Sequence, residues 1–337
     1  MTPLSALATA CVPIDHYSAV HVAASTARSL AEQCRLPGAM PDQAAVLASE
    51  LASNLDKHAR GGTLYIRPLP LGGGLEILAA DRGPGMPEIE RCLTDGYTTT
   101  GTMGAGLGAV TRIATHFTIR TDAEMGTLAC ARLALPEQPQ AARQPAGLIC
   151  VPADREQHCG DACAIIDADR TRTMIVIDGL GHGPHAAEAA QTALRSFHAV
   201  VDRPLTHILT ALHRSLRRTR GAAVGILRLG AEKAEYCGIG NVRAVAISPH
   251  QVHHRLTGQP GVVGWNIPAP QSHRFPLAPG TTAVLHSDGI DSRWTHVPPH
   301  FLLRLPPSLL AGAVAHHHRS TRDDAAVLAA LPHPRHS

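Results

Sequence analysis

The sequence predicts an α+β protein with two domains, each built from its own sheet and helices. The chain has 337 residues, about twice the length of an average domain. Hydrophobic residues make up 44% and charged residues 17%, with a net charge of +3, which is typical of globular rather than disordered chains. Residues 135–146 are rich in Pro, Gln and Ala without an apolar period, as in linkers. We therefore expect domains at 1–134 and 147–332.

The first domain begins with helices and continues mainly with strands. Residues 18–34 and 42–59 carry apolar side chains at helical spacing. Short apolar runs separated by glycine turns follow them and predict strands. These strands are expected at 63–68, 74–80, 117–121 and 127–134, with a helix that starts at glycines over 105–116.

The second domain is dominated by short strands, and it does not repeat the first. Two helices are expected near 184–200 and 204–218. Apolar strands next to acidic residues are expected at 162–166, 173–177, 283–286 and 325–331. Both halves are therefore α+β.

Composition argues against several classes of function. The basic residues are 28 Arg and two Lys with no dense basic stripe, so no nucleic-acid partner is indicated. No apolar run reaches the roughly 18–20 residues of a membrane helix, and no signal peptide is evident, so we expect no membrane partner and a cytoplasmic location. The eight cysteines form no C-x-x-C pair, which favours buried reduced thiols.

A polar face on the second helix is the first candidate site. Glu50 and Asn54 are four residues apart and therefore share one helical face. Such a face is either solvated or functional. The next strand ends in Asp81, followed by Gly83 and Gly85, where glycines allow close backbone approach. The glycine-rich stretch 101–108 then leads into a helix whose N–H groups could bind phosphate.

Together, E-x-x-x-N, D-x-G-x-G, G-x-G-x-G and G-T resemble the GHKL (histidine-kinase-like) ATP-binding fold, an α/β sandwich. Residues 95–101 make the chain most similar to anti-sigma-type serine kinases of the RsbT-like, stressosome type. The resemblance implies that Glu50 is the general base for a serine or threonine hydroxyl. It implies that Asn54 holds Mg²⁺ and that Asp81 accepts from adenine. The remaining ATP-binding positions that it implies are Gly83, Gly85, Gly104, Gly106, Leu107, Gly108 and Thr127.

Carboxylates beside apolar strands form the second candidate site. Asp161 opens one strand, Asp178 ends another, Asp288 follows a third, and the pair 323–324 precedes a fourth. Carboxylate oxygens at one edge of a sheet are suited to hard cations such as Mg²⁺ or Mn²⁺.

With the sequence D-G-L-G-H-G at 178–183, this order resembles protein phosphatases of the 2C fold in their SpoIIE/RsbX-like form, an α-β-β-α sandwich. The resemblance implies two metal ions, with Asp178 bridging them and the Gly179 carbonyl on the second. Asp288 and Asp323 would complete the first metal, and Asp161 would bind directly or through water. The choice between Asp323 and Asp324 stays open.

Two histidine features remain to be placed. His182 could protonate the leaving group or simply support the loop, and neither role is favoured. The histidine run 316–318 is expected on a solvated surface outside the strand ends. No arginine stands out as a phosphate ligand.

The combined resemblance implies an ATP-dependent serine/threonine kinase fused to a metal-dependent phosphoserine/phosphothreonine phosphatase. The implied substrates are STAS-domain proteins, either anti-sigma antagonists or stressosome scaffolds. The alternative is a nucleotide-dependent module that sequesters a sigma factor or switch partner, fused to an active phosphatase. A second phosphatase as partner and a homodimer are further options.

Overall fold

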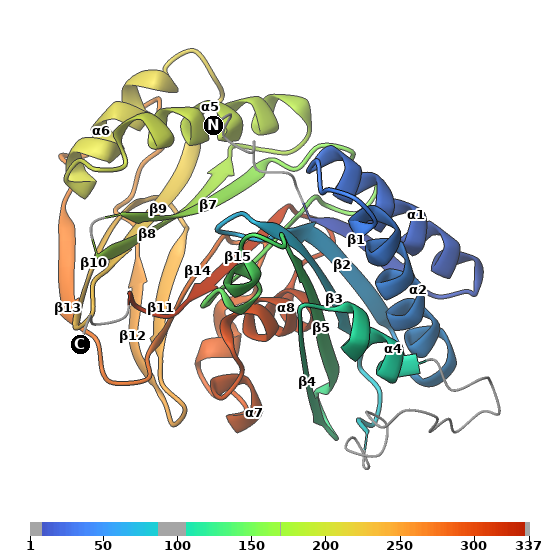
Figure 1. Cartoon of the computed structure of the whole chain (residues 1–337). Coiled ribbons are helices and arrows are strands. Elements are labelled where there is room, and N and C mark those ends of the chain that lie inside the picture. Colours follow the sequence, from blue (N-terminus) through green and yellow to red (C-terminus); the bar gives the residue numbers. More distant parts are fainter. Residues whose placement is uncertain (1–8, 87–105, 169, 334–337) are drawn as a thin grey trace. The chain divides into compact units, whose positions relative to one another are not determined.

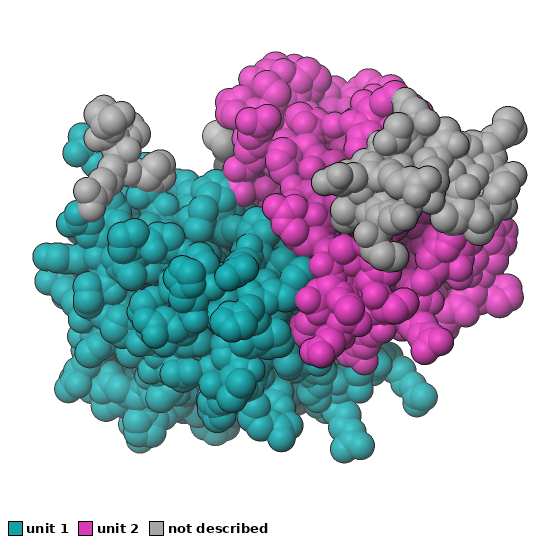
Figure 2. Space-filling view, turned by 90° about the horizontal axis from the view of Figure 1, so that it is seen from below, with its two compact units in different colours: residues 1–8, 145–337 teal, residues 9–144 magenta. Residues whose placement is uncertain are grey.

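The computed structural model describes residues 9–86, 106–168 and 170–333 (Figure 1). They form two compact units that meet in the sequence between Gln144 and Pro145 (Figure 2). No helix in the described ranges is long and apolar enough to cross a membrane.

The N-terminal unit is one antiparallel five-stranded sheet with helices packed on it. The strand order is β1-β2-β3-β5-β4. Helices α1 and α2 pack on each other and on the sheet, and α4 packs on α2 (Figure 1). The elements are β1 (Ala10–Ile14), α1 (Ser18–Gln33), α2 (Met40–His58), β2 (Gly62–Pro68), β3 (Gly74–Ala80), α4 (Gly106–Ile113), β4 (His116–Asp122) and β5 (Gly126–Ala134).

Helix α2 has both a clear start and a clear end in the sequence. Pro41 lies in its first turn, where a missing N–H costs nothing, and Asp42 complements the positive end of the helix dipole. Lys57 and His58 lie in the last turn, at the negative end. Its core-facing stripe is Ala44, Ala45, Leu47, Ala48, Leu51, Ala52 and Leu55.

The segment expected to be a linker is structured. Residues Pro139–Arg143 form a short 3₁₀ helix, and Ala142 is buried. Arg132 of β5 donates to the carbonyls of Ala142 and Gln144, at 3.1 and 3.0 Å. The Gln144 side chain also hydrogen-bonds to backbone in the turn between β2 and β3. This segment therefore belongs to the N-terminal unit, because the polar residues that suggested a spacer satisfy that unit's hydrogen bonds.

The C-terminal unit is a sandwich of two five-stranded antiparallel sheets. The strand orders are β13-β10-β9-β8-β7 and β12-β11-β14-β15-β6. Helices α5 and α6 pack on the first sheet, and α8 packs on β6 and β15 of the second, giving α-β-β-α layers (Figure 1). The strands are β6 (Ala146–Val151), β7 (Asp161–Ala168), β8 (Thr171–Gly179), β9 (Ala222–Leu229), β10 (Lys233–Ile239), β11 (Arg243–Ile247), β12 (Val252–Thr257), β13 (Ser272–Pro276), β14 (Thr282–His286) and β15 (Ala325–Ala330). The helices are α5 (Pro184–Val200), α6 (Leu205–Ser215), the 3₁₀ helix η2 (Ser292–Thr295), α7 (His300–Leu303) and α8 (Pro307–His318).

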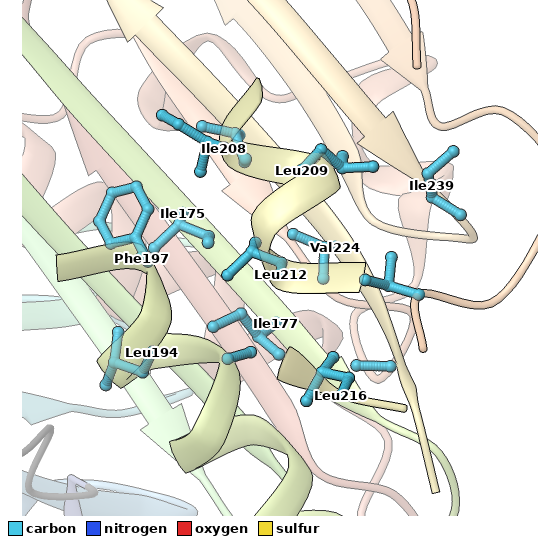
Figure 3. Packing of buried hydrophobic residues seen from close by; sticks show 14 of the residues in the cluster. Ile175, Ile177, Leu194, Phe197, Ile208, Leu209, Leu212, Leu216, Val224 and Ile239 are labelled. Carbon is cyan, nitrogen blue, oxygen red and sulfur yellow. The ribbon is translucent and has the colours of Figure 1, made fainter. Parts of the chain in front are cut away.

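The core between α5, α6 and the first sheet fixes the outer layer of this unit. Phe197 and Leu194 of α5 point toward Ile175 and Ile177 of β8 (Figure 3). Side chains of α6 and of β9 and β10 complete the cluster, among them Ile208, Leu209, Leu212, Val224 and Ile239. Full burial of one such side chain stabilises the fold by about 1.5–3 kcal/mol.

Three details differ from the sequence-based expectation. Strand β1 was not expected, and the helix expected to reach residue 116 ends at Ile113, where β4 soon begins. The prediction that the histidine run is solvated is wrong for His316, which is 7% exposed. The run is the last turn of α8, whose preceding residues are apolar and buried all around, so the core covers part of its polar end as well.

Candidate active sites

In the N-terminal unit, Asp81 is held rigidly at the end of β3. Its Oδ1 accepts from the backbone N–H of Gly83 at 2.7 Å and of Thr127 at 3.1 Å. Burial raises the pKa of Asp81, and these two hydrogen bonds oppose that rise. Among the described residues, no hydrogen bond occupies the second carboxylate oxygen. That oxygen could therefore accept from the amino group of a bound ring.

Gly126, beside Asp81, and Gly85, beside Thr121, lie where the backbone leaves no room for a side chain. Gly126 has φ +74°, and a Cβ there would lie 2.2 Å from the carbonyl oxygen of Asp81. Gly85 has φ +76°, and a Cβ there would lie 2.7 Å from Oγ1 of Thr121. Only glycine adopts this backbone conformation readily, and only glycine fits the space.

The polar face of α2 carries a base and an amide. Both Glu50 and Asn54 are partly buried. Burial raises the pKa of Glu50, and the positive charge of Lys57 opposes that rise. The Nδ2 atom of Asn54 is buried without a hydrogen-bond partner in the described structure. A buried amide without a partner is costly, so the side chain suits a polar ligand.

The phosphate-loop residues are only partly within the described structure. Gly104 and residues 95–101 lie outside the described residues. Gly106, Leu107 and Gly108 form the first turn of α4, with Leu107 buried. The Gly108 carbonyl accepts from the Thr111 hydroxyl at 2.8 Å. Helix α4 packs against α2, which brings this turn to the helix that carries Glu50 and Asn54.

In the C-terminal unit, Asp161 and Asp178 lie side by side at one end of the first sheet. They are partners in the register of β7 and β8. Asp161 is only 3% exposed, and its Oδ2 accepts from the Ser287 hydroxyl at 2.6 Å. Ser287 follows β14 of the other sheet, so this hydrogen bond joins the two sheets at the same end.

The acidic side chains at this end repel one another. Burial, followed by the charges of Asp161 and Asp288, raises the pKa of Asp178 to about 9, and Asp178 is hydrogen-bonded to Asp288. Burial also raises the pKa of Asp161, with nearby acidic groups adding to the rise and the Ser287 hydrogen bond opposing it. Clustered carboxylates with raised pKa values are stabilised by a cation, which removes the repulsion.

The structure gives Asp323 and Asp324 different tasks. Asp324 is buried, and its two oxygens accept from the backbone N–H of Ala153 at 3.0 Å and of Gly160 at 2.9 Å. Asp323 is exposed, and its Oδ1 accepts from the N–H of Asp324 at 2.9 Å. Asp324 therefore ties down the loop before Asp161, while Asp323 keeps an oxygen for a ligand.

The loop after Asp178 is packed tightly. The Gly179 N–H donates to the Gly160 carbonyl at 3.0 Å, and a Cβ on Gly179 would lie 2.3 Å from the Ala186 carbonyl oxygen. Three residues after Gly179, the exposed ring of His182 pairs with Glu156, with Nδ1 at 3.0 Å from Oε1. Only glycine can therefore occupy position 179.

The carboxylates of this cluster are not yet arranged around a common point, so they would have to move to bind a metal ion. As the side chains lie, no group of three or more His, Cys, Asp or Glu in the described ranges already forms a metal site. The donor set is nevertheless all oxygen and strongly acidic, and its raised pKa values reflect carboxylates crowded together. These residues therefore fit Mg²⁺ or Mn²⁺ better than zinc.

Three residues at this site were not assigned roles from the sequence. Ser287 orients Asp161, and Asn241 donates to Oδ2 of Asp288 at 2.6 Å. Arg220 places its Nη1 3.2 Å from the point that a Cβ of Gly181 would occupy. The only signal for Ser287 was its place before Asp288, and Arg220 carried none because it is far from the motifs in sequence.

Comparisons with known proteins found matches for each part of the chain. The family model of stage II sporulation protein E (SpoIIE) matches residues 168–331. The serine/threonine-protein kinase RsbT of Bacillus subtilis (strain 168) is 40% identical over 90 residues, which are 26% of this chain and 68% of RsbT. A chain from a structure of the bacterial stressosome has a TM-score of 0.51 and 29% identity, covering 55% of this chain and 98% of its own. RsbX in complex with magnesium has a TM-score of 0.47 and 22% identity, covering 55% and 93%.

The fold and the two sites define a class of protein, in which a GHKL-type serine/threonine kinase domain precedes a 2C-type serine/threonine phosphatase domain. The chain belongs to the RsbT serine/threonine-protein kinase family through its N-terminal unit, and its C-terminal unit carries a SpoIIE domain. It is a regulator of the partner-switching kind.

Proposed function

We propose that this chain both phosphorylates and dephosphorylates STAS-domain proteins, using ATP in the first unit and metal ions in the second. The observation that carries the proposal is that one chain holds two distinct sites with opposite chemistry. In the N-terminal unit, the second oxygen of Asp81 and the buried Nδ2 of Asn54, which has no partner among the described residues, suit a nucleotide. Around Asp178, crowded carboxylates suit cations.

In the kinase reaction, Glu50 takes the proton of the serine or threonine hydroxyl as its oxygen attacks the γ-phosphorus, and ADP leaves. Burial makes Glu50 a stronger base than an ordinary carboxylate. Asp81 orients the adenine, and Asn54 suits the Mg²⁺ that ATP carries. Positioning and charge neutralisation account for most of catalysis in phosphoryl transfer.

In the phosphatase reaction, water attacks the phosphorus of phosphoserine or phosphothreonine, and the serine or threonine oxygen leaves with a proton. Asp161, Asp178, Asp288, Asp323 and the Gly179 carbonyl would hold two Mg²⁺ or Mn²⁺ ions. Bound in this way, the ions supply an activated water and neutralise the phosphoryl oxygens. Ser287 and Asn241 orient the carboxylates, and Asp324 fixes the loop that carries Asp161.

The test uses the purified chain, Mg-ATP and a STAS-domain protein from the same genome, followed by intact mass. A gain of one phosphoryl group, and its loss once ATP is removed and Mn²⁺ is added, is the expected result. Gain without loss would mean that the two units serve different substrates.

The alternative function is sequestration of a sigma factor or switch partner by the N-terminal unit. Glu50→Ala separates the two, since it should abolish transfer while ATP binding and partner binding remain. Asp56→Ala, on the same helix, is the matched control. Signalling that survives Glu50→Ala would show that binding, not phosphorylation, is the function.

A further inference from the structure

Three exposed side chains gather around the backbone of Gly221, beside the loop that follows Asp178. The backbone N–H of Leu180 donates to the Gly221 carbonyl at 3.0 Å. Arg220 precedes Gly221, and Cδ1 of Trp265 lies 3.4 Å from the point that a Cβ of Gly221 would occupy. Leu180 is 37% exposed, Trp265 is 62% exposed, and Arg220 is exposed as well. These three side chains form a surface that we call the tryptophan patch.

The backbone that carries the tryptophan patch is held in place by hydrogen bonds. The Thr219 hydroxyl accepts from the Gly221 N–H at 3.0 Å, and the Thr219 carbonyl accepts from Nε1 of Trp265 at 3.4 Å. Ala222 and Val263 exchange two backbone hydrogen bonds, at 3.0 and 2.9 Å. Gly221 has φ +77°, and a Cβ there would lie 2.8 Å from the Val263 carbonyl oxygen. Because the exposed ring already has a fixed place, little conformational entropy is lost when a partner covers it.

Arg220 brings a free positive charge to the candidate phosphatase site. Its Nη1 lies 3.2 Å from the point that a Cβ of Gly181 would occupy, so the guanidinium lies beside the loop after Asp178. The Gly181 carbonyl oxygen is in turn 3.4 Å from the Cβ position of Gly160, the residue before Asp161. Within the described ranges, no hydrogen bond or ion pair uses the Arg220 guanidinium. Its five N–H donors are therefore available to a ligand.

The two apolar members of the patch stand out by their exposure. The chain has two tryptophans, and the other one, Trp294, is only 3% exposed. Leu180 and Trp265 are two of the six large hydrophobic side chains exposed in the part of the chain that the structure describes. Tryptophan is among the residue types that most often dominate the binding energy of protein interfaces. Together with the charge of Arg220, the patch suits a segment that carries both an anion and an apolar side chain.

We propose, on the basis of the proposed function, that the tryptophan patch binds the phosphorylated segment of the phosphatase's protein substrate. Arg220 donates charge-assisted hydrogen bonds to the phosphoryl oxygens. Trp265 and Leu180 contact an apolar side chain next to the phosphorylated serine or threonine. The patch therefore selects phosphorylated residues that have an apolar neighbour in the sequence of the substrate.

The test uses the full chain and a synthetic peptide library with a fixed phosphoserine and varied flanking residues. In Mn²⁺, mass spectrometry identifies the peptides that lose their phosphoryl group first. We expect peptides with an apolar residue next to phosphoserine to react at least about fivefold faster than the others. Trp265→Ala should reduce this preference to about one, because the surface that contacts the apolar side chain is lost.

Arg220→Gln tests the charged part of the patch. It should raise KM for all phosphopeptides about tenfold or more, since a charged hydrogen bond to the phosphoryl group is lost, while the preference for apolar neighbours remains. Arg218→Gln is the matched control for charge, because it removes an exposed arginine two residues earlier. Val297→Ala is the matched control for apolar surface, because Val297 is 88% exposed. Both controls should change neither KM nor the preference.

Binding of the same library to the immobilised chain, with metals chelated, gives a second readout without turnover. Phosphopeptides with an apolar neighbour should be retained longest, and Trp265→Ala should abolish that difference. Circular dichroism checks that this variant folds, and Leu180→Ala tests the same preference if it does not.

The proposal would be overturned if neither readout shows a preference in the wild type, or if the preference survives Trp265→Ala. Equal effects of Arg220→Gln and Arg218→Gln would also overturn it, because the role of Arg220 would then be only its long-range charge. A chain that retains the apolar-flanked phosphopeptides but hydrolyses none of them would contradict the proposed phosphatase activity and support the patch.

Discussion

The buried charge cluster in the N-terminal sheet offers a sharp test of its energetics. Glu76 of β3 is fully buried between Arg67 of β2 and Arg132 of β5, its partners in the strand register. It accepts from both arginines, with Arg132 Nε at 2.6 Å. Burial alone would raise the pKa of Glu76, but the two arginine charges outweigh it and hold the pKa below its ordinary value. Glu76→Gln keeps the shape and removes the charge.

The two arginines do not depend equally on Glu76. Arg132 retains the carbonyls of Ala142 and Gln144, whereas the Nε and Nη1 of Arg67 have no partner among the described residues. The substitution therefore leaves Arg67 buried without a counter-charge. Breaking a buried pair in this way costs about 3–5 kcal/mol. At 1.4 kcal/mol per factor of ten, the opening equilibrium should rise roughly 100- to 4,000-fold.

Hydrogen exchange measured on peptides from β2, β3 and β5 reports this opening directly. Unfolding of the C-terminal unit does not affect the exchange of these peptides. The control is Asp42→Asn, which removes an exposed pair with Arg28 at 2.6 Å. Exposed pairs contribute about 0–1 kcal/mol, so exchange should barely change. Replacing Arg67 and Glu76 together by Met and Leu should recover part of the loss, because Arg67 is removed and Arg132 keeps the carbonyls of Ala142 and Gln144. A loss below about 1 kcal/mol for Glu76→Gln would refute the reasoning.

Three further predictions follow from the sites. The pKa of Asp178 is raised to about 9 in the folded unit, so with metals chelated the C-terminal unit should lose stability as the pH rises from about 4 toward 9. Addition of Mn²⁺ should reverse this loss. A melting temperature that rises with pH over this range would contradict the prediction. Ser287→Ala should lower Mn²⁺ affinity about tenfold by titration calorimetry, since Asp161 loses its orienting hydroxyl, and unchanged affinity would count against that role. Gly126→Val should weaken binding of an ATP analogue more than tenfold and destabilise the N-terminal unit by about 1–3 kcal/mol, because its Cβ would strike the Asp81 carbonyl; normal binding would show that the turn can relax.

Much of the architecture was predictable because the motifs lie where helices and strands begin or end. Helix α2 and strands β2, β3 and β5 lie within a residue or two of the expected bounds. The apolar spacing of α2 and the glycines that flank β3 and β5 are local signals, and local signals are readable from one sequence. Strand β1 was missed because its five residues follow no turn signal and are defined by pairing with β2.

The sequence predicted the site residues that belong to motifs, but not the residues that contact them from distant parts of the chain. Asp324 binds the backbone N–H groups of Ala153 and Gly160, which are remote in sequence, whereas Asp323 keeps one oxygen for a ligand; neither could be read from the sequence. Asn241 gained a role only when β11 came beside β14. The buried His316 was missed because the histidine run looked polar, whereas the helix around it is covered on all sides.

The short 3₁₀ helix after β5 has a practical consequence for dividing the protein. A fragment cut at Ala134, where the sheet ends, would strip Arg132 of two carbonyl acceptors and expose the turn that Gln144 closes. The carbonyl of the next residue, Pro145, accepts from the backbone N–H of Leu331 and so belongs to the C-terminal unit. A kinase fragment that keeps its fold should therefore extend through Gln144, and a phosphatase fragment should begin at Pro145.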